Sequence, residues 1–170
     1  MPVDSYVNIS NVEVAFTTVS LGEASAGKGV GLGATGKLDP SMMPVGIGPV
    51  TVTAKASMDI NAGSFVNLYY DTGTLKMRYS DATDNTKPYN GFVLAAVPSG
   101  TNGTVYLPGN INTNLIGLTP GANYYIDKAT PGGITTDVSA FSGGNIVQHA
   151  GLAISATQLI TGVPPFKTTI

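Results

Sequence analysis

The sequence predicts an all-β fold: a compact β-barrel or β-sandwich of two pseudo-repeated halves, preceded by an extended N-terminal arm. Three observations support this prediction. Short segments alternate apolar and polar residues, glycine and proline separate them, and two stretches of the chain resemble each other. The 170 residues include 22 glycines and 11 prolines, which leave little room for long helices. Hydrophobic residues reach 42%, which excludes a disordered chain.

Charged residues make up only 11% of the chain, less than half of the roughly 25% usual for soluble domains. The eight basic residues are scattered, so they cannot form the basic face of a nucleic-acid-binding protein. No apolar run approaches the roughly 18 residues that cross a bilayer. We therefore expect partners other than nucleic acid or membrane, and a surface covered by small polar residues and protein contacts.

The chain divides into an arm (residues 1–49), a β domain (50–163) and a C-terminal tail (164–170). Residues 12–19 form a short β-like segment, whereas residues 22–49 are rich in glycine and interrupted by proline. Because apolar residues punctuate this stretch, we expect it to be ordered by lying on its own domain or on a neighbouring subunit. Methionine fills irregular gaps between proteins. The expected contact residues of the arm are Val12, Val14, Phe16, Val19, Met42, Met43, Val45 and Ile47.

Within the β domain, the clearest prediction is a hairpin of residues 65–70 and 75–79, joined by a glycine-containing turn at 71–74. Leu75, Met77 and Tyr79 would share one face of its second strand, opposite two cations. We expect a helical turn only at 156–160. The other expected strands are 50–54, 92–97 paired with 104–107 around a reversal at 98–103, 124–126, 134–136, 146–148 and 152–154.

An internal repeat supports the two halves. The phrase around Gly63 recurs at Gly121, and the phrase that begins at Gly91 recurs at Gly151. The two offsets are 58 and 60 positions, so they agree within two residues. Two pseudo-equivalent halves folded around one core would explain this agreement.

Chemical motifs are weak. Residues 31–36 match the dinucleotide pattern GxGxxG and precede Lys37, but Leu38 stands where a phosphate loop needs serine or threonine. The prolines that follow prevent the helix on which both patterns depend. We therefore predict a flexible or partner-ordered glycine loop.

The chain has one histidine, His149, and no cysteine, which leaves no complete catalytic constellation around a histidine or thiol. Residues 81–85 offer several oxygens but lack the spacing of a calcium loop, so we predict a turn. The tyrosines predict half-buried sheet packing rather than a sugar platform. We expect no enzymatic activity, no cofactor and no metal.

Four phrases of the β domain resemble the small decoration or cement proteins of tailed-bacteriophage heads and the capsid-binding heads of related virion fibres. The resemblance covers residues 50–160 and consists of β-turn phrases rather than a catalytic signature. The phrases are GFVLAAV (91–97), TVYLPG (104–109), GLTPGANYYID (117–127) and GLAISAT (151–157).

This resemblance implies a structural protein, made in the host cytoplasm, that binds the outer surface of the mature capsid and reinforces contacts between major capsid proteins. It also implies a homo-oligomer, with dimer and trimer as the expected forms. The alternative is a tail or head-fibre component that recognises a host-surface glycan, with Tyr124 and Tyr125 as the residues to test.

Overall fold

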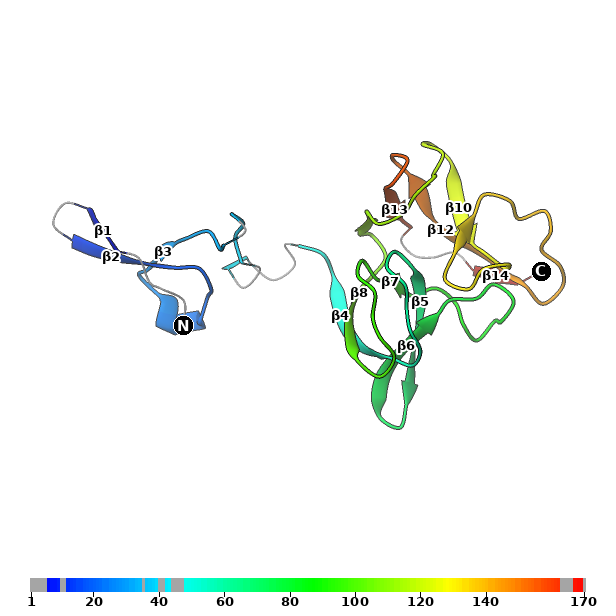
Figure 1. The fold of residues 1–170 in the computed structure, drawn as a ribbon, viewed down its shortest axis with the longest axis horizontal. Helices are drawn as coiled ribbons and strands as arrows, with labels where there is room; N and C mark the ends of the chain where they lie inside the picture. The colour runs from blue at the N-terminus through cyan, green and yellow to red at the C-terminus, as the bar shows by residue number, and fades with distance from the viewer. Residues whose placement is uncertain are drawn as a thin grey trace. The chain divides into compact units, whose positions relative to one another are not determined.

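The computed structural model describes residues 6–9, 12–34, 36–39, 42–43, 48–162 and 167–169; for 6–9, 12–14 and 167–169 it describes only the backbone. The chain forms two compact units, Met1–Gly48 and Pro49–Ile170 (Figure 1). The boundary lies one residue from the division that the sequence predicts between arm and β domain.

The first unit contains a three-stranded sheet with the order β1-β2-β3. β1 (Tyr6–Ile9) and β2 (Val12–Thr17) are antiparallel, and β3 (Gly29–Val30) runs parallel to β2. A short 3-10 helix, η1 (Gly22–Ser25), lies in the crossover between β2 and β3. The predicted arm therefore contains a sheet of its own.

The second unit begins with a closed barrel in which β4, β6, β5, β7 and β8 are neighbours in that order. The predicted hairpin is confirmed, because β5 pairs antiparallel with β6 from Val66↔Tyr79 to Asp71↔Thr74. Thr72 and Gly73 at its tip have φ angles of 49° and 79°, as a two-residue hairpin turn requires. The strands are β4 (Thr51–Ala56), β5 (Phe65–Asp71), β6 (Thr74–Tyr79), β7 (Gly91–Phe92) and β8 (Asn102–Tyr106).

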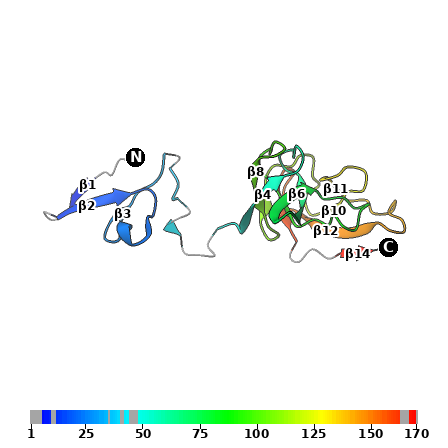
Figure 2. The same cartoon turned by 90° about the horizontal axis from the view of Figure 1, so that it is seen from below.

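A second sheet with the order β11-β10-β12-β13-β9 lies beside the barrel in both views (Figures 1 and 2). The helical turn predicted at 156–160 is wrong, because Leu159 and Ile160 pair with β9 in this sheet. The strands predicted at 146–148 and 152–154 belong to one continuous strand, which ends at Ala153. The strands are β9 (Ile111–Asn112), β10 (Asn123–Ile126), β11 (Ile134–Thr135), β12 (Ile146–Ala153), β13 (Leu159–Thr161) and β14 (Lys167–Thr169). β14, within the predicted tail, pairs with β12.

The two pseudo-repeated halves are confirmed by strand pairing. The order β6-β5-β7-β8-β4 of the barrel recurs as β11-β10-β12-β13-β9 in the second sheet. The register repeats as well, because Val66↔Gly91 in the first half corresponds to Tyr124↔Gly151 in the second. The halves differ at closure: β4 and β6 form a parallel pair, whereas no pairing of β9 with β11 is described.

The second unit has two clusters of buried side chains instead of the single core that the sequence predicts, and only one of them is shared by the two halves. One cluster lies within the first half and includes Ile60, Met77 and Val105. The other joins aromatic residues of the first half, such as Phe65 and Phe92, to apolar residues of the second sheet. The sequence pattern predicts which residues are buried, but it does not predict which buried side chains pack against each other.

Gln148 of β12 connects the second sheet to the loop that precedes β7. Its side-chain oxygen accepts a hydrogen bond from the Tyr89 N–H at 2.7 Å, and its Nε2 donates to the Tyr89 carbonyl at 2.9 Å. Both residues are buried. The carboxamide therefore takes the place of a neighbouring strand and satisfies two buried main-chain groups.

Candidate functional site

The predicted contact residues of the arm lie in different parts of the first unit. Val12 and Val14 are in β2, paired with Ile9 and Val7 of β1. Val45 and Ile47 lie outside the described residues. The remaining four, whose side chains are described, are Phe16, Val19, Met42 and Met43.

Phe16 packs within its own unit. It is half-buried and paired with Gly29 of β3, and a Cβ added to Gly29 would lie 2.7 Å from the ring. The ring therefore occupies the space that the missing side chain leaves. The Phe16 ring, predicted to contact a partner, therefore already packs against β3 of its own unit.

Val19 and Met42 line two separate cavities. Val19 and Leu38 line a cavity of about 430 Å³, together with Lys37 and Asp39. Met42 and Val30 line another of about 220 Å³. Of the four predicted contact residues whose side chains are described, the structure thus places Val19 and Met42 at separate cavities.

Exposed apolar side chains are the main feature of this unit. Sequence reasoning did not select several of them as contact residues, although Leu21 is 68% and Leu32 60% exposed. Among the described side chains of residues 15–48, Thr17 is buried and no apolar side chain is. We call the exposed set the arm surface: Val19, Leu21, Val30, Leu32, Leu38 and Met43.

The glycine motif forms a tight loop beside this surface. The Gly33 N–H donates to the Lys37 carbonyl at 2.9 Å, and the Gly36 N–H donates to the Gly33 carbonyl at 2.9 Å. Among the described residues of 36–43, Met42 has a 3-10 conformation and no α-helix follows the loop. Two amides that a bound phosphate would need are therefore already used within the loop.

His149 and the neighbouring tyrosines are used in local contacts. His149 Nε2 lies 3.1 Å from Asn123 Oδ1, and the Tyr125 ring meets the imidazole edge to face. Tyr124 is buried, and its hydroxyl accepts a hydrogen bond from the Thr119 N–H at 2.9 Å. These tyrosines do not form an exposed platform for a sugar.

The acidic segment 81–87 forms two consecutive turns. Asp81 accepts hydrogen bonds from the N–H and hydroxyl of Thr83, at 2.9 and 2.6 Å. Asp84 repeats this pattern with Thr86 and contacts Lys87 Nζ at 3.0 Å. The Thr86 hydroxyl and N–H, with Lys87, hold the pKa of Asp84 well below its usual range. Within the described residues, no cluster of three or more His, Cys, Asp or Glu side chains is arranged for a metal.

Asp84→Ala is expected to lower the free energy of unfolding by about 1 kcal/mol at pH 7, a modest value because the pair is partly exposed. A carboxyl with a lowered folded-state pKa stabilises the fold above its unfolded pKa of about 4, and this stabilisation is lost as the pH falls further. Urea denaturation at pH 7 and pH 2.5 should show the difference shrinking. Asp84→Asn keeps an acceptor for Thr86 and serves as the control; equal losses at both pH values would contradict the assignment.

In the described part of the chain, no helix is long and apolar enough to cross a membrane. Comparison with protein-family models finds no match, and neither does comparison with curated proteins. The chain is similar to one solved structure, described as "The crystal structure of head fiber gp8.5 N base in bacteriophage phi29". The identity is 16%, the match covers 70% of this chain and 98% of that one, and the TM-score is 0.44. A likeness of this size carries no functional argument, so function must be argued from the residues.

Proposed function

We propose that this chain is a non-enzymatic virion protein that binds the outer surface of the mature phage capsid and stabilises contacts between major capsid proteins. The β-turn phrases of residues 50–160 suggest this role through their resemblance to decoration and capsid-binding fibre proteins. In this proposal the protein self-associates as a dimer or trimer, is made in the host cytoplasm, and has neither nucleic acid nor membrane as a partner.

The observation that carries the proposal is the arm surface. Six large apolar side chains are exposed in a unit whose described part buries none. Such a unit gains little stability from its own packing, because apolar surface stabilises a fold by about 25 cal/mol for each Å² removed from water. Contact with another protein would bury this surface and supply the missing stability. A capsid offers such contacts in many equivalent copies.

The charge distribution of the chain supports a protein partner in the same way. Only 11% of the residues are charged, and the two described salt bridges, Lys76–Asp71 and Lys87–Asp84, join neighbours in the sequence. Few charges therefore have to lose their hydration when the protein docks. Desolvation of unpaired charges, which opposes the burial of a surface, is small for such a chain.

Replacing Leu21 and Leu32 together by serine is expected to weaken capsid binding at least about tenfold, because two of the most exposed side chains of the arm surface are lost. The measurement is co-sedimentation of the purified protein with mature and immature shells of its virus, followed by heating of both. The unaltered protein should saturate mature shells and raise their melting temperature.

Tyr70→Ser is the matched control, since Tyr70 is 75% exposed but lies on β5 of the second unit. Equal binding by the leucine variant and the control would contradict a role for the arm surface. Absence of binding to either shell, with the protein found instead in isolated tails, would favour the alternative of a tail or fibre component.

A further inference from the structure

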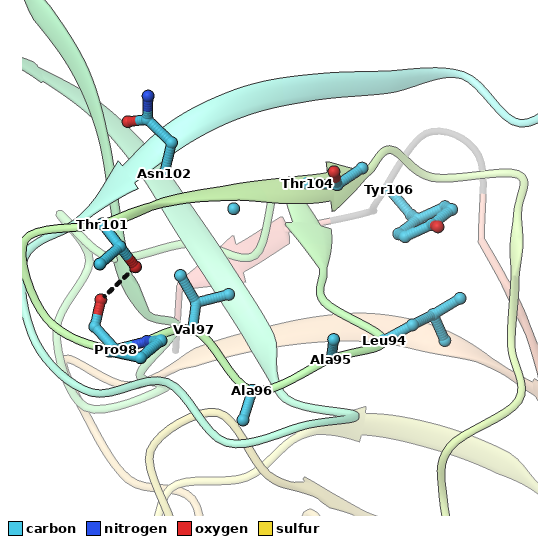
Figure 3. A pocket seen from close by; sticks show the side chains of 10 residues that line it. Leu94, Ala95, Ala96, Val97, Pro98, Thr101, Asn102, Thr104 and Tyr106 are labelled. Carbon is cyan, nitrogen blue, oxygen red and sulfur yellow. Dashed lines mark hydrogen bonds between the residues drawn. The ribbon is translucent and has the colours of Figure 1, made fainter. Parts of the chain in front are cut away.

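The barrel has an incomplete seam between β7 and β8. These strands share a single registered pair, Phe92↔Tyr106, after which the chain leaves β8 and Val97 forms a bridge with Ile60 instead. The predicted hairpin of 92–97 with 104–107 is therefore correct only at its open end. Residues 94–96 and the first residues of β8 lie on opposite sides of a gap (Figure 3). The buried Val97 side chain fills the inner side of this gap, where it packs on Gly103 beside Met77.

The edge of β8 at this gap carries free main-chain groups. The Leu107 N–H donates to the Val50 carbonyl at 2.9 Å, so odd-numbered positions of β8 face β4. Asn102 and Thr104 therefore direct their N–H and C=O groups away from β4, towards the gap. Among the described residues, no main-chain hydrogen bond from segment 94–97 reaches either of them.

In the second pseudo-repeated half, the equivalent pair of strands, β12 and β13, stays hydrogen-bonded beyond this point. There, the Ile154 N–H donates to the Gln158 carbonyl at 2.9 Å and continues the ladder between β12 and β13. In the pseudo-repeat, Leu94 corresponds to Ile154 and Thr104 corresponds to Gln158. Nine residues separate Leu94 from Thr104 but only three separate Ile154 from Gln158. The longer connection holds the first seam open.

The gap forms a cavity of about 280 Å³ whose lining has no charged side chain. Leu94 and Tyr106 provide an apolar wall at one end, and Pro98 and Thr101 close the other, joined by a 2.7 Å hydrogen bond from the Thr101 hydroxyl to the Pro98 carbonyl (Figure 3). Ala95, which lies between them, is exposed and small, so a main chain could approach closely.

We propose that this seam binds a short, extended, uncharged peptide segment of a partner protein, which adds a strand along residues 102–104 of β8. A strand residue whose N–H and C=O point to the same side can exchange both main-chain hydrogen bonds with one residue of an extended peptide. The molecule already uses the equivalent pairing once, where the Gln148 carboxamide binds both main-chain groups of Tyr89.

The proposal does not depend on capsid binding and is tested on the isolated, full-length protein by NMR titration of backbone amides. The probe is a capped tetrapeptide of alternating valine and threonine, which is uncharged and favours an extended backbone. We expect the amide signals of Asn102 and Thr104 to shift. The same peptide methylated on its main-chain nitrogens should leave these signals unchanged.

Two pairs of variants separate main-chain recognition from side-chain effects. Thr104→Pro removes a donor that does not face β4 and should weaken binding at least about tenfold, whereas Thr104→Val should bind within about twofold of the unaltered protein. Ala95 points towards β8 and Ala96 away from it (Figure 3). Ala95→Phe should therefore block the cavity, and Ala96→Phe should not, which keeps the test valid if the proline variant unfolds.

Three results would overturn the proposal. The first is no shift with the unmethylated peptide. The second is equal binding by the methylated peptide, or equal losses in both Thr104 variants. The third is a response of these signals to N-acetylglucosamine or maltose with none to the peptides, which would assign the cavity to a saccharide.

Discussion

Gln148→Leu is expected to lower the free energy of unfolding by about 3 kcal/mol, although leucine is similar in size and more apolar. The Tyr89 N–H and C=O lose their partner and stay buried, and each unsatisfied buried group costs about 1–3 kcal/mol. Urea denaturation followed by circular dichroism measures the change. Gln158→Leu, at a half-buried position, is the control and should have a much smaller effect.

Gln148→Glu tests whether the donor and the acceptor both matter. Ionised glutamate can accept from the Tyr89 N–H but cannot donate to its carbonyl, and burial raises the pKa of such a carboxyl. The folded state would then bind a proton more tightly than the unfolded state, so the loss of stability should shrink as the pH falls from 7 to 4. A leucine variant as stable as the unaltered protein, or a glutamate variant without pH dependence, would contradict the role assigned to the carboxamide.

Gly151→Ala is expected to destabilise the second sheet by about 3 kcal/mol or to prevent its folding. A Cβ at this position would lie 2.2 Å from the Ile160 carbonyl oxygen and 2.8 Å from a methyl carbon of Leu159. Since the nearest obstacle is backbone, β12 and β13 would have to separate, and overpacking of this kind costs about 1–3 kcal/mol or more. Thermal unfolding measures the loss.

Gly91→Ala repeats this test in the other half, where the added Cβ would lie 2.6 Å from the Tyr106 carbonyl oxygen. Gly31→Ala is the control, because its added Cβ would meet its nearest neighbour at 3.4 Å, an ordinary contact. A Gly151→Ala protein that melts within about 2 °C of the control would show that the two strands can move apart without cost.

Local patterns in the sequence were sufficient for the hairpin and the repeat. The hairpin of β5 and β6 depends on alternation and on a turn that contains Gly73, and both are visible within fifteen residues. The repeat was visible because each half needs glycine at equivalent close approaches, such as Gly91 and Gly151. Patterns of this kind can be recognised in the sequence without knowledge of the tertiary structure.

Non-local contacts explain the errors. Residues 156–160 lack a strong strand signal, and Leu159 and Ile160 are in a strand because β9, nearly fifty positions earlier, pairs with them. Strand β7 ends early because Val97 bonds to Ile60. In the arm, the exposure of each side chain depends on which residues the sheet covers. The sequence therefore indicated an apolar contact segment, but it did not indicate that Leu21 and Leu32 are among its most exposed side chains.

The pairing of first and last strands within each half also sets the pace at which the protein can fold. β4, which also pairs with β6, cannot complete its pairing before β8 is available, and β9 pairs with β13; each of these partners lies about fifty residues further along the chain. Closing loops of this length is slow in β proteins. During synthesis, the first half can close once β8 has emerged, before the second half exists.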